Sequence, residues 1–331
     1  MIAIVDFYNQ DIGLKILFPE ADYFVLEKEF ERAKLNLKYN IKQLEKTDCL
    51  NSQTYKTIFI IAPLYDATDI FINKKKPAFF VEKTKKKLLD MVSLIKGNAF
   101  SRVCFFDNYD YDYDPNLIFS DDLTFVADHE IIFFKRNYSK YKEYKPNVFP
   151  FPYIMFGPQC NIDMVSNRIR VDPVAKKIPR LFFSGTLLNH VDYFYNIFRN
   201  RNSFYSKLCV KNNICNPGHL PHEEFIKELS SSKYCLDLLG VGDPNIRTFE
   251  ILAVGSLRIG QRSDLKWPFP EEFRAETIFE NDNDLYLKIK TLESNTKLYL
   301  DCLQKQNEIV DNFMNTTYLR QYILDTIYTS K

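Results

Sequence analysis

The chain has 331 residues, of which 46% are hydrophobic and 26% charged, a composition typical of a globular protein with one large or two smaller domains. A formal net charge of +1 gives no general attraction to polyanions, so we expect no nucleic-acid partner and at most peripheral membrane contact. The seven cysteines contain no C-x-x-C pair, which argues against a disulfide framework or a zinc site. We find neither a signal peptide nor a transmembrane segment and expect a cytoplasmic protein.

Short apolar segments alternate with amphipathic segments in the first half of the chain. The apolar segments, which are typical of buried strands, are Ile2 to Phe7, Thr57 to Asp66, Arg102 to Asp110 and Glu130 to Tyr138. The charged, amphipathic stretches Leu26 to Leu44 and Lys85 to Ile95 predict helices. Strands that alternate with helices indicate an α/β domain with a mostly parallel sheet.

A proline-rich stretch follows this first half. Its prolines are Pro146, Pro150, Pro152 and Pro158. Because proline cannot donate a hydrogen bond to a sheet, we expect an extended connector and place the domain junction between Lys145 and Lys177. The predicted division is an N-terminal domain at 1–150, a connector at 151–177, a C-terminal domain at 178–295, and helices at 296–331 that pack back toward the N-terminal domain.

A second α/β alternation fills the rest of the chain. The expected strands are Arg180 to Thr186, Ser206 to Lys211, Lys233 to Gly240 and Ser256 to Gly260. The expected helices are Val191 to Phe198, one that begins near Pro221, Asn245 to Val254, and most of Asp282 to Tyr328. Glu223 and Glu224 suit the first turn of the second helix, and Gly255 is a C-terminal stop for the third.

A glycine-rich turn joins two of these elements. Gly240 and Gly242 follow an apolar strand, where a parallel sheet binds ligands, and glycine lets a ligand approach the backbone closely. The next helix directs its N-terminus at the same place, and Arg247 in its first turn adds a full positive charge. Glu250 is on the same helix face, and its carboxylate can accept two hydrogen bonds from a ribose diol. The pattern suits a nucleotide sugar, although a tight turn with a surface Arg–Glu pair explains it equally well.

The segment SSSKYCLDLLGVGDPNIRTFEILAVGSLRI resembles the donor-binding segment of GT-B glycosyltransferases, above all the exostosin-type and group 1 families. The resemblance covers about residues 180 to 260 and implies two Rossmann-like domains that face each other across a cleft. It implies that the C-terminal domain binds a UDP- or GDP-sugar without a further cofactor and that the acceptor, a glycan or glycoconjugate, lies mainly on the N-terminal domain. In this resemblance Arg247 contacts the diphosphate and Glu250 the ribose. The other implied donor-site residues are Gly185, Thr186, Gly240, Gly242, Asp243, Asn245 and Thr248.

The sequence departs from the resembling families in one informative respect. Many retaining members carry two glutamates eight positions apart, but the residue eight positions before Glu250 is Gly242. This difference favours an inverting enzyme, which needs a general base for the acceptor hydroxyl. The candidate bases at the ends of N-terminal strands are Asp107, Asp66, Asp11 and Asp6. Since the chain has no membrane anchor, a bacterial or viral cytosolic relative fits better than an animal exostosin-type enzyme.

Two other functions stay open at this point. Asp110, Asp112 and Asp114 follow a predicted strand and could hold a divalent cation, as in metal-dependent GT-A transferases. A degenerate transferase fold without a base would instead be a non-catalytic glycan-binding or scaffold protein. His219 and His222 are separated by Pro221, so we do not expect them to form a metal pair, and we expect a metal-independent reaction.

Overall fold

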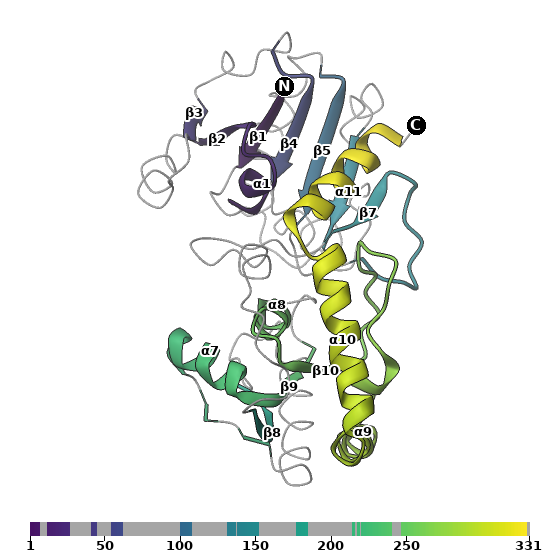
Figure 1. The fold of residues 1–331 in the computed structure, drawn as a ribbon. Helices are drawn as coiled ribbons and strands as arrows, with labels where there is room; N and C mark the ends of the chain where they lie inside the picture. Colours follow the sequence, from purple (N-terminus) through teal and green to yellow (C-terminus); the bar gives the residue numbers. More distant parts are fainter. Residues whose placement is uncertain are drawn as a thin grey trace, which may run out of the picture. The chain divides into compact units, whose positions relative to one another are not determined.

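Two compact units, each with a parallel sheet, make up the chain (Figure 1). The computed structural model describes residues 1–6, 12–26, 41–44, 54–61, 100–107, 131–136, 138–151, 177–184, 214–215, 217–218, 220–239 and 246–329. Unit 1 comprises Met1–Cys160, Leu265–Pro268 and Leu319–Lys331. Unit 2 comprises Asn161–Asp264 and Phe269–Tyr318. The predicted α/β class is therefore confirmed.

Unit 1 contains a seven-stranded sheet with the order β3-β2-β1-β4-β5-β6-β7. The strands are β1 (Ile2–Asp6), β2 (Asp22–Leu26), β3 (Ile41–Leu44), β4 (Thr57–Ile61), β5 (Arg102–Asp107), β6 (Ile131–Lys135) and β7 (Val148–Pro150). Every neighbouring pair is parallel. This is a doubly wound order, in which the chain reverses direction across the sheet between β1 and β4.

Buried apolar side chains explain why the middle strands form where the sequence predicts them. All five residues of β4 and of β6 are buried. Aromatic rings continue the packing across the strands, since Phe106 and Phe134 stack with their centroids 4.8 Å apart. The predicted helix from Leu26 to Leu44 is wrong at both ends, because Leu26 is the last residue of β2 and Ile41–Leu44 pairs with β2 as a parallel strand. A strand of four residues is too short for periodicity to separate it from a helix.

Helix α11 (Thr316–Thr329) enters unit 1 at Leu319 and is fixed to it by polar contacts. Arg320 donates to the carboxylate of Glu20, and Tyr322 Oη donates to the carbonyl of Pro150 at 2.8 Å. Arg102 Nε donates to the carbonyl of Ile327 at 3.3 Å, near the C-terminal end of the helix. Residues from the end of the chain are thus part of the first unit.

Unit 2 contains a four-stranded parallel sheet with the order β11-β10-β9-β8. The strands are β8 (Ile178–Phe182), β9 (Ser232–Asp237), β10 (Leu257–Gln261) and β11 (Ile278–Phe279). The described helices of this unit are α7 (His222–Ser231), α8 (Ile246–Ala253), η5 (Ala275–Thr277), α9 (Asp282–Ser294) and α10 (Thr296–Phe313). Unit 1 contains α1 (Ile12–Leu17) in addition to its part of α11. None of the helices in the described ranges is long and apolar enough to cross a membrane.

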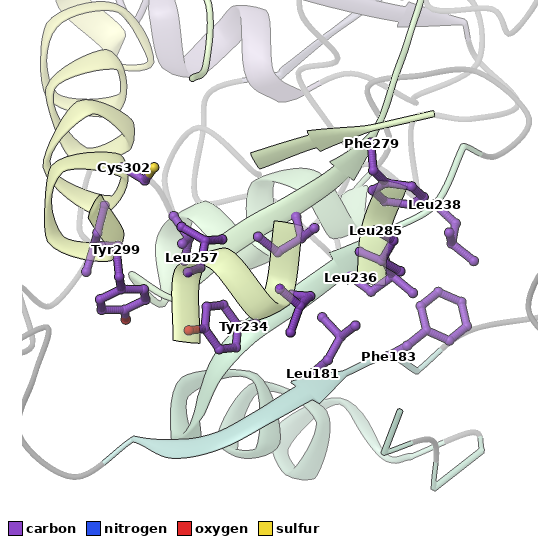
Figure 2. Close-up of a cluster of buried hydrophobic side chains, with 14 residues drawn as sticks. Leu181, Phe183, Tyr234, Leu236, Leu238, Leu257, Phe279, Leu285, Tyr299 and Cys302 are labelled. Atoms are coloured by element: carbon purple, nitrogen blue, oxygen red, sulfur yellow. The ribbon is translucent and has the colours of Figure 1, made fainter. Parts of the chain in front are cut away.

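The two faces of this sheet are covered by different helices. Leu181, Tyr234 and Leu236 face one side, where α9 and α10 supply Leu285 and Tyr299 (Figure 2). Residues of opposite parity face the other side and pack on α7 and α8; this second cluster contains Phe182, Phe225, Leu229, Cys235 and Ile251. Both faces of the parallel sheet are therefore buried, which accounts for its continuous apolar strands.

The ends of α7 and α8 follow the expected signals. Pro221 is the N-cap of α7, and the first turn contains Glu223 and Glu224 as predicted. Gly255 has a φ of 68° directly after α8, a left-handed conformation that glycine adopts without strain. Its carbonyl accepts a hydrogen bond from Lys177 Nζ at 3.0 Å. The start of α7 and the end of α8 are thus fixed by local sequence.

Candidate functional site

Arg247 lies in the first turn of α8, next to the carboxyl ends of the unit 2 strands. The helix begins at Ile246, nine residues after β9 ends at Asp237, so it starts beyond the strand end where a parallel sheet binds ligands. The guanidinium lies over the ring of Phe183, 4.9 Å from its centroid, and Phe183 directly follows β8. Arg247 is partly exposed although its Nε atom is buried. This packing orients a planar cation at the strand ends.

Glu250 lies one turn later and is 4% exposed. Its Oε1 is 3.1 Å from Nε2 of His222, the first residue of α7. Burial raises the pKa of the Glu250 carboxyl, while the hydrogen bond and charge of His222, and the charge of Arg247, act in the opposite direction. The described residues give this carboxylate one side-chain hydrogen-bond partner, so it retains capacity to accept further bonds.

A buried carboxylate under α8 holds the helix to the sheet. Asp237 is 3% exposed, and its Oδ2 accepts hydrogen bonds from Thr248 Oγ1 at 2.8 Å and from Arg258 Nε at 2.6 Å. Its Oδ1 is buried and accepts no hydrogen bond from the described residues. The resemblance implies that Thr248 is a donor-site residue, and the structure shows its hydroxyl bonded to Asp237. The bond ties α8 to β9 and so orients the helix that carries Arg247 and Glu250.

The guanidinium of Arg258 lies in the space that a side chain at Gly260 would occupy. A Cβ at Gly260 would lie 2.4 Å from the Cζ, Nη1 and Nη2 atoms of Arg258. The guanidinium also packs over Phe273, 5.3 Å from the ring centroid. The backbone N–H of Arg258 donates to Gln306 Oε1 of α10 at 2.9 Å. The ion pair with Asp237 therefore depends on the missing side chain at Gly260.

A second polar contact lies after the end of β8. Ser184 Oγ donates to the carbonyl of Gly218 at 2.7 Å, and Gly218 has a φ of 84°. Ser184 is buried and precedes the predicted donor-site residues Gly185 and Thr186. The bond fixes the chain immediately before these two residues.

Many predicted site residues lie outside the described residues, and their roles stay predictions. In the donor segment these are Gly185, Thr186, Gly240, Gly242, Asp243 and Asn245. In the N-terminal half they are the candidate bases Asp11 and Asp66 and the acidic residues Asp110, Asp112 and Asp114.

Asp107 and Asp6 are the candidate bases that the structure describes. Asp107 ends β5 and forms an ion pair with Lys135 at 3.0 Å, and neither side chain is exposed. Asp6 ends β1, is also buried, and accepts a hydrogen bond from Tyr23 Oη at 2.6 Å. Both carboxylates are occupied by partners within unit 1, and in this arrangement they contribute to its packing.

Sequence reasoning missed three residues of the site. Asp237 and Arg258 stand inside apolar strands, and an ionised side chain within a buried strand is a signal that could have identified them. His222 has no such signal, because its partner Glu250 is 28 positions away on another helix. Its role depends on how α7 and α8 pack together.

The close approach of Arg258 to Gly260 gives a stability prediction. Gly260→Ala should lower the free energy of unfolding by about 2 kcal/mol, because the new Cβ displaces a guanidinium held by a buried carboxylate. Urea unfolding measures the change. As a control, Arg258→Met/Gly260→Ala should be no less stable than Arg258→Met. An equal loss in the presence and absence of Arg258 would show that the clash is not the cause.

The raised pKa of Glu250 gives a prediction with a defined pH dependence. Between the ordinary value of 4.5 and the raised pKa, the unfolded chain releases this proton before the folded one, so stability falls as pH rises. Glu250→Gln should therefore raise the free energy of unfolding by about 0.5–2 kcal/mol at neutral pH. At about pH 4, below both pKa values, the gain should vanish. The exposed control Glu280→Gln should show neither effect, and a destabilised Glu250→Gln at neutral pH would contradict the prediction.

Comparisons with known proteins bear on this geometry. Residues 182–322 match the family model described as glycosyl transferase-like, and this range contains Arg247, Glu250 and Asp237. No curated protein matches the sequence. The exostosin-like subtype expected from the sequence stays a prediction.

Solved structures share the fold at low sequence identity. T4 phage β-glucosyltransferase, described as a DNA modifying enzyme, is 12% identical over 98% of this chain and 99% of its own, with a TM-score of 0.51. The N-terminal domain of Candida albicans trehalose-6-phosphate phosphatase is 11% identical over 100% of this chain and 97% of its own, with a TM-score of 0.53. These likenesses show the fold, and the GT-B class predicted from the sequence is confirmed. The family model marks residues 182–322 as glycosyl transferase-like, and the chain shares the GT-B fold of known glycosyltransferases.

Proposed function

We propose that the chain transfers a sugar from a UDP-sugar to a glycan or glycoconjugate acceptor, without a metal ion and with inversion at the anomeric carbon. The observation that carries the proposal is the pairing of Arg247 and Glu250 on α8, which begins beyond the carboxyl end of β9. One side chain is a cation suited to a diphosphate, and the other is a buried carboxylate suited to a diol.

The diphosphate would bind at the start of α8. The helix offers N–H groups and the positive end of its dipole, and Arg247 adds a planar guanidinium stacked on Phe183. Together they would stabilise the negative charge that develops on the leaving nucleoside diphosphate. In this proposal the protein itself supplies the charge that a metal ion supplies in GT-A enzymes.

The ribose would bind at Glu250. A carboxylate in an apolar setting repels phosphate but accepts hydrogen bonds from two adjacent hydroxyls, which is the chemistry of a ribose 2′,3′-diol. The choice of uracil over guanine draws support from T4 phage β-glucosyltransferase, which shares the fold and has been described in complex with its UDP-glucose substrate. Calorimetric titration of GDP beside UDP tests this choice.

Inversion rests on the sequence. An inverting reaction uses a base that removes the proton of the acceptor hydroxyl while the sugar–phosphate bond breaks. The position that holds the first glutamate of retaining families is Gly242 here. Because Asp107 and Asp6 have buried partners, we favour Asp11 or Asp66 as the base. Proton NMR of the product's anomeric centre decides between the two stereochemical outcomes.

The donor site is tested by two substitutions with different ligand profiles. Arg247→Ala should weaken the binding of both UDP and inorganic diphosphate by about 1.5–3 kcal/mol, because it removes a charge-assisted hydrogen bond. Glu250→Ala should weaken the binding of UDP and leave the binding of inorganic diphosphate nearly unchanged. Isothermal titration calorimetry measures both ligands. Arg262 and Glu280 are exposed residues of the same unit, so Arg262→Ala and Glu280→Gln are matched controls. Both control variants should bind UDP and inorganic diphosphate like the wild type.

If both site variants bind UDP with wild-type affinity, the donor site is wrongly placed. If the wild type binds UDP but yields no product with any acceptor, the non-catalytic alternative holds.

Metal dependence separates the GT-B mechanism from the GT-A alternative. We expect turnover to survive EDTA, and the triple variant Asp110→Asn/Asp112→Asn/Asp114→Asn to retain donor binding and lose acceptor affinity at most. Turnover is measured as UDP release. Complete loss in EDTA that manganese restores would transfer the charge-stabilising role to the acidic segment. The test is informative because T4 phage β-glucosyltransferase has also been described in complex with UDP and Mn²⁺.

A further inference from the structure

His222 makes a contact that the donor site does not explain by itself. It is the first residue of α7, its side chain is 37% exposed, and its Nε2 lies 3.1 Å from Oε1 of Glu250. Phe225, one turn further along α7, is buried against Phe182 and lies 6.4 Å from the imidazole between ring centroids. The histidine is therefore held by the packing of α7 and reaches from that helix to the second turn of α8.

The geometry leaves part of the Glu250 carboxylate available to a ligand. His222 occupies Oε1, and the described residues give Oε2 no hydrogen bond. A buried carboxylate with one partner is costly to keep ionised, so the histidine contact bears directly on its charge. The charged groups that act on it are Arg247 on α8 and His222 on α7. Asp237 on β9 acts on Arg247 and pairs with Arg258 on β10, and α10 presents the uncharged Gln306 to Arg258.

These charges divide into two separate sets. Arg258 and Thr248 are bonded to Asp237, so neither reaches Glu250 through a described hydrogen bond. Arg247 is shared electrostatically between Asp237 and Glu250 and is the group assigned to the diphosphate. Among the described residues, His222 is the group that hydrogen-bonds the Glu250 carboxylate.

We propose that His222 is a positioning residue for the donor: it fixes the Glu250 carboxylate and keeps it ionised, so that Oε2 is presented to the ribose diol of the nucleotide. This inference rests on the proposed function of Glu250 and extends it to a residue on a different helix. His222 itself need not touch the donor.

A pH dependence of nucleotide binding follows from this role. The diol requires an ionised carboxylate, so affinity for UDP should fall as the pH drops through the pKa of Glu250. Since burial raises this pKa and the His222 contact lowers it, removal of the histidine should move the acid-side loss of affinity to higher pH. Inorganic diphosphate, which needs Arg247 but not Glu250, should not show this change.

The experiment compares two substitutions that differ in hydrogen bonding. His222→Leu removes the N–H donor, and we expect it to weaken UDP binding roughly tenfold at neutral pH and to shift the acid-side loss of affinity to higher pH. His222→Gln keeps an N–H donor but cannot become charged, so it should restore most of the affinity at neutral pH. Calorimetric titrations of UDP and of inorganic diphosphate between about pH 5 and 8 provide the readout, with Glu224→Gln in the same exposed helix turn as a control.

A double substitution separates positioning from general structure. In a Glu250→Gln background, His222→Leu should have no further effect on UDP affinity, because the carboxylate on which it acts is gone. The role of His222 is overturned if His222→Leu loses affinity for UDP and for inorganic diphosphate equally. It is also overturned if His222→Leu binds UDP with the affinity and pH profile of the wild type. Should His222→Leu not fold, a His222→Gln profile identical to the wild type overturns it too. Failure of the proposed function is seen separately, as wild-type protein that does not bind UDP or an Arg247→Ala variant that binds it normally.

Discussion

Asp237 accepts two hydrogen bonds on one oxygen, from Thr248 on α8 and from Arg258 on β10, and the candidate site depends on this convergence. The ladder of the sheet sets the distance between β9 and β10, but nothing in a ladder fixes the rotation of a helix that packs above it. The bond to Thr248 supplies that constraint, and Arg247 and Glu250 flank Thr248 on the same helix. Asp237 thus sets the positions of Arg247 and Glu250, although it contacts the helix at Thr248.

The residues of the site differ in how well the sequence revealed them. Arg247 and Glu250 are three positions apart on a helix after a strand, and this local pattern predicts a shared face. The resemblance implies that Thr248 is a donor-site residue, but it does not show that a strand carboxylate binds the Thr248 hydroxyl. His222 could not be assigned, since its approach to Glu250 is a product of tertiary packing between two helices.

The fold shows the same division between local and long-range information. β4, β5 and β6 are continuous apolar runs, so composition alone places them in a buried parallel sheet. Gly255 and Pro221 mark helix ends through backbone geometry that needs no partner. Ile41–Leu44 was expected to be helical because its residues also suit an amphipathic pattern, and only pairing with β2 makes it a strand. Short elements of this kind depend on contacts made by distant segments.

The attachment of α11 has a consequence for the order in which the protein can fold during synthesis. Helix α11 contacts Arg102, Pro150 and Glu20 of unit 1. The ribosome nevertheless adds the α11 residues that belong to unit 1 after all of unit 2. The first sheet can begin to assemble early, but the surface that receives α11 stays uncovered until translation has passed the second unit. The unit that starts first is therefore completed last, and the nascent chain carries the uncovered surface that receives α11 while the second unit is being made.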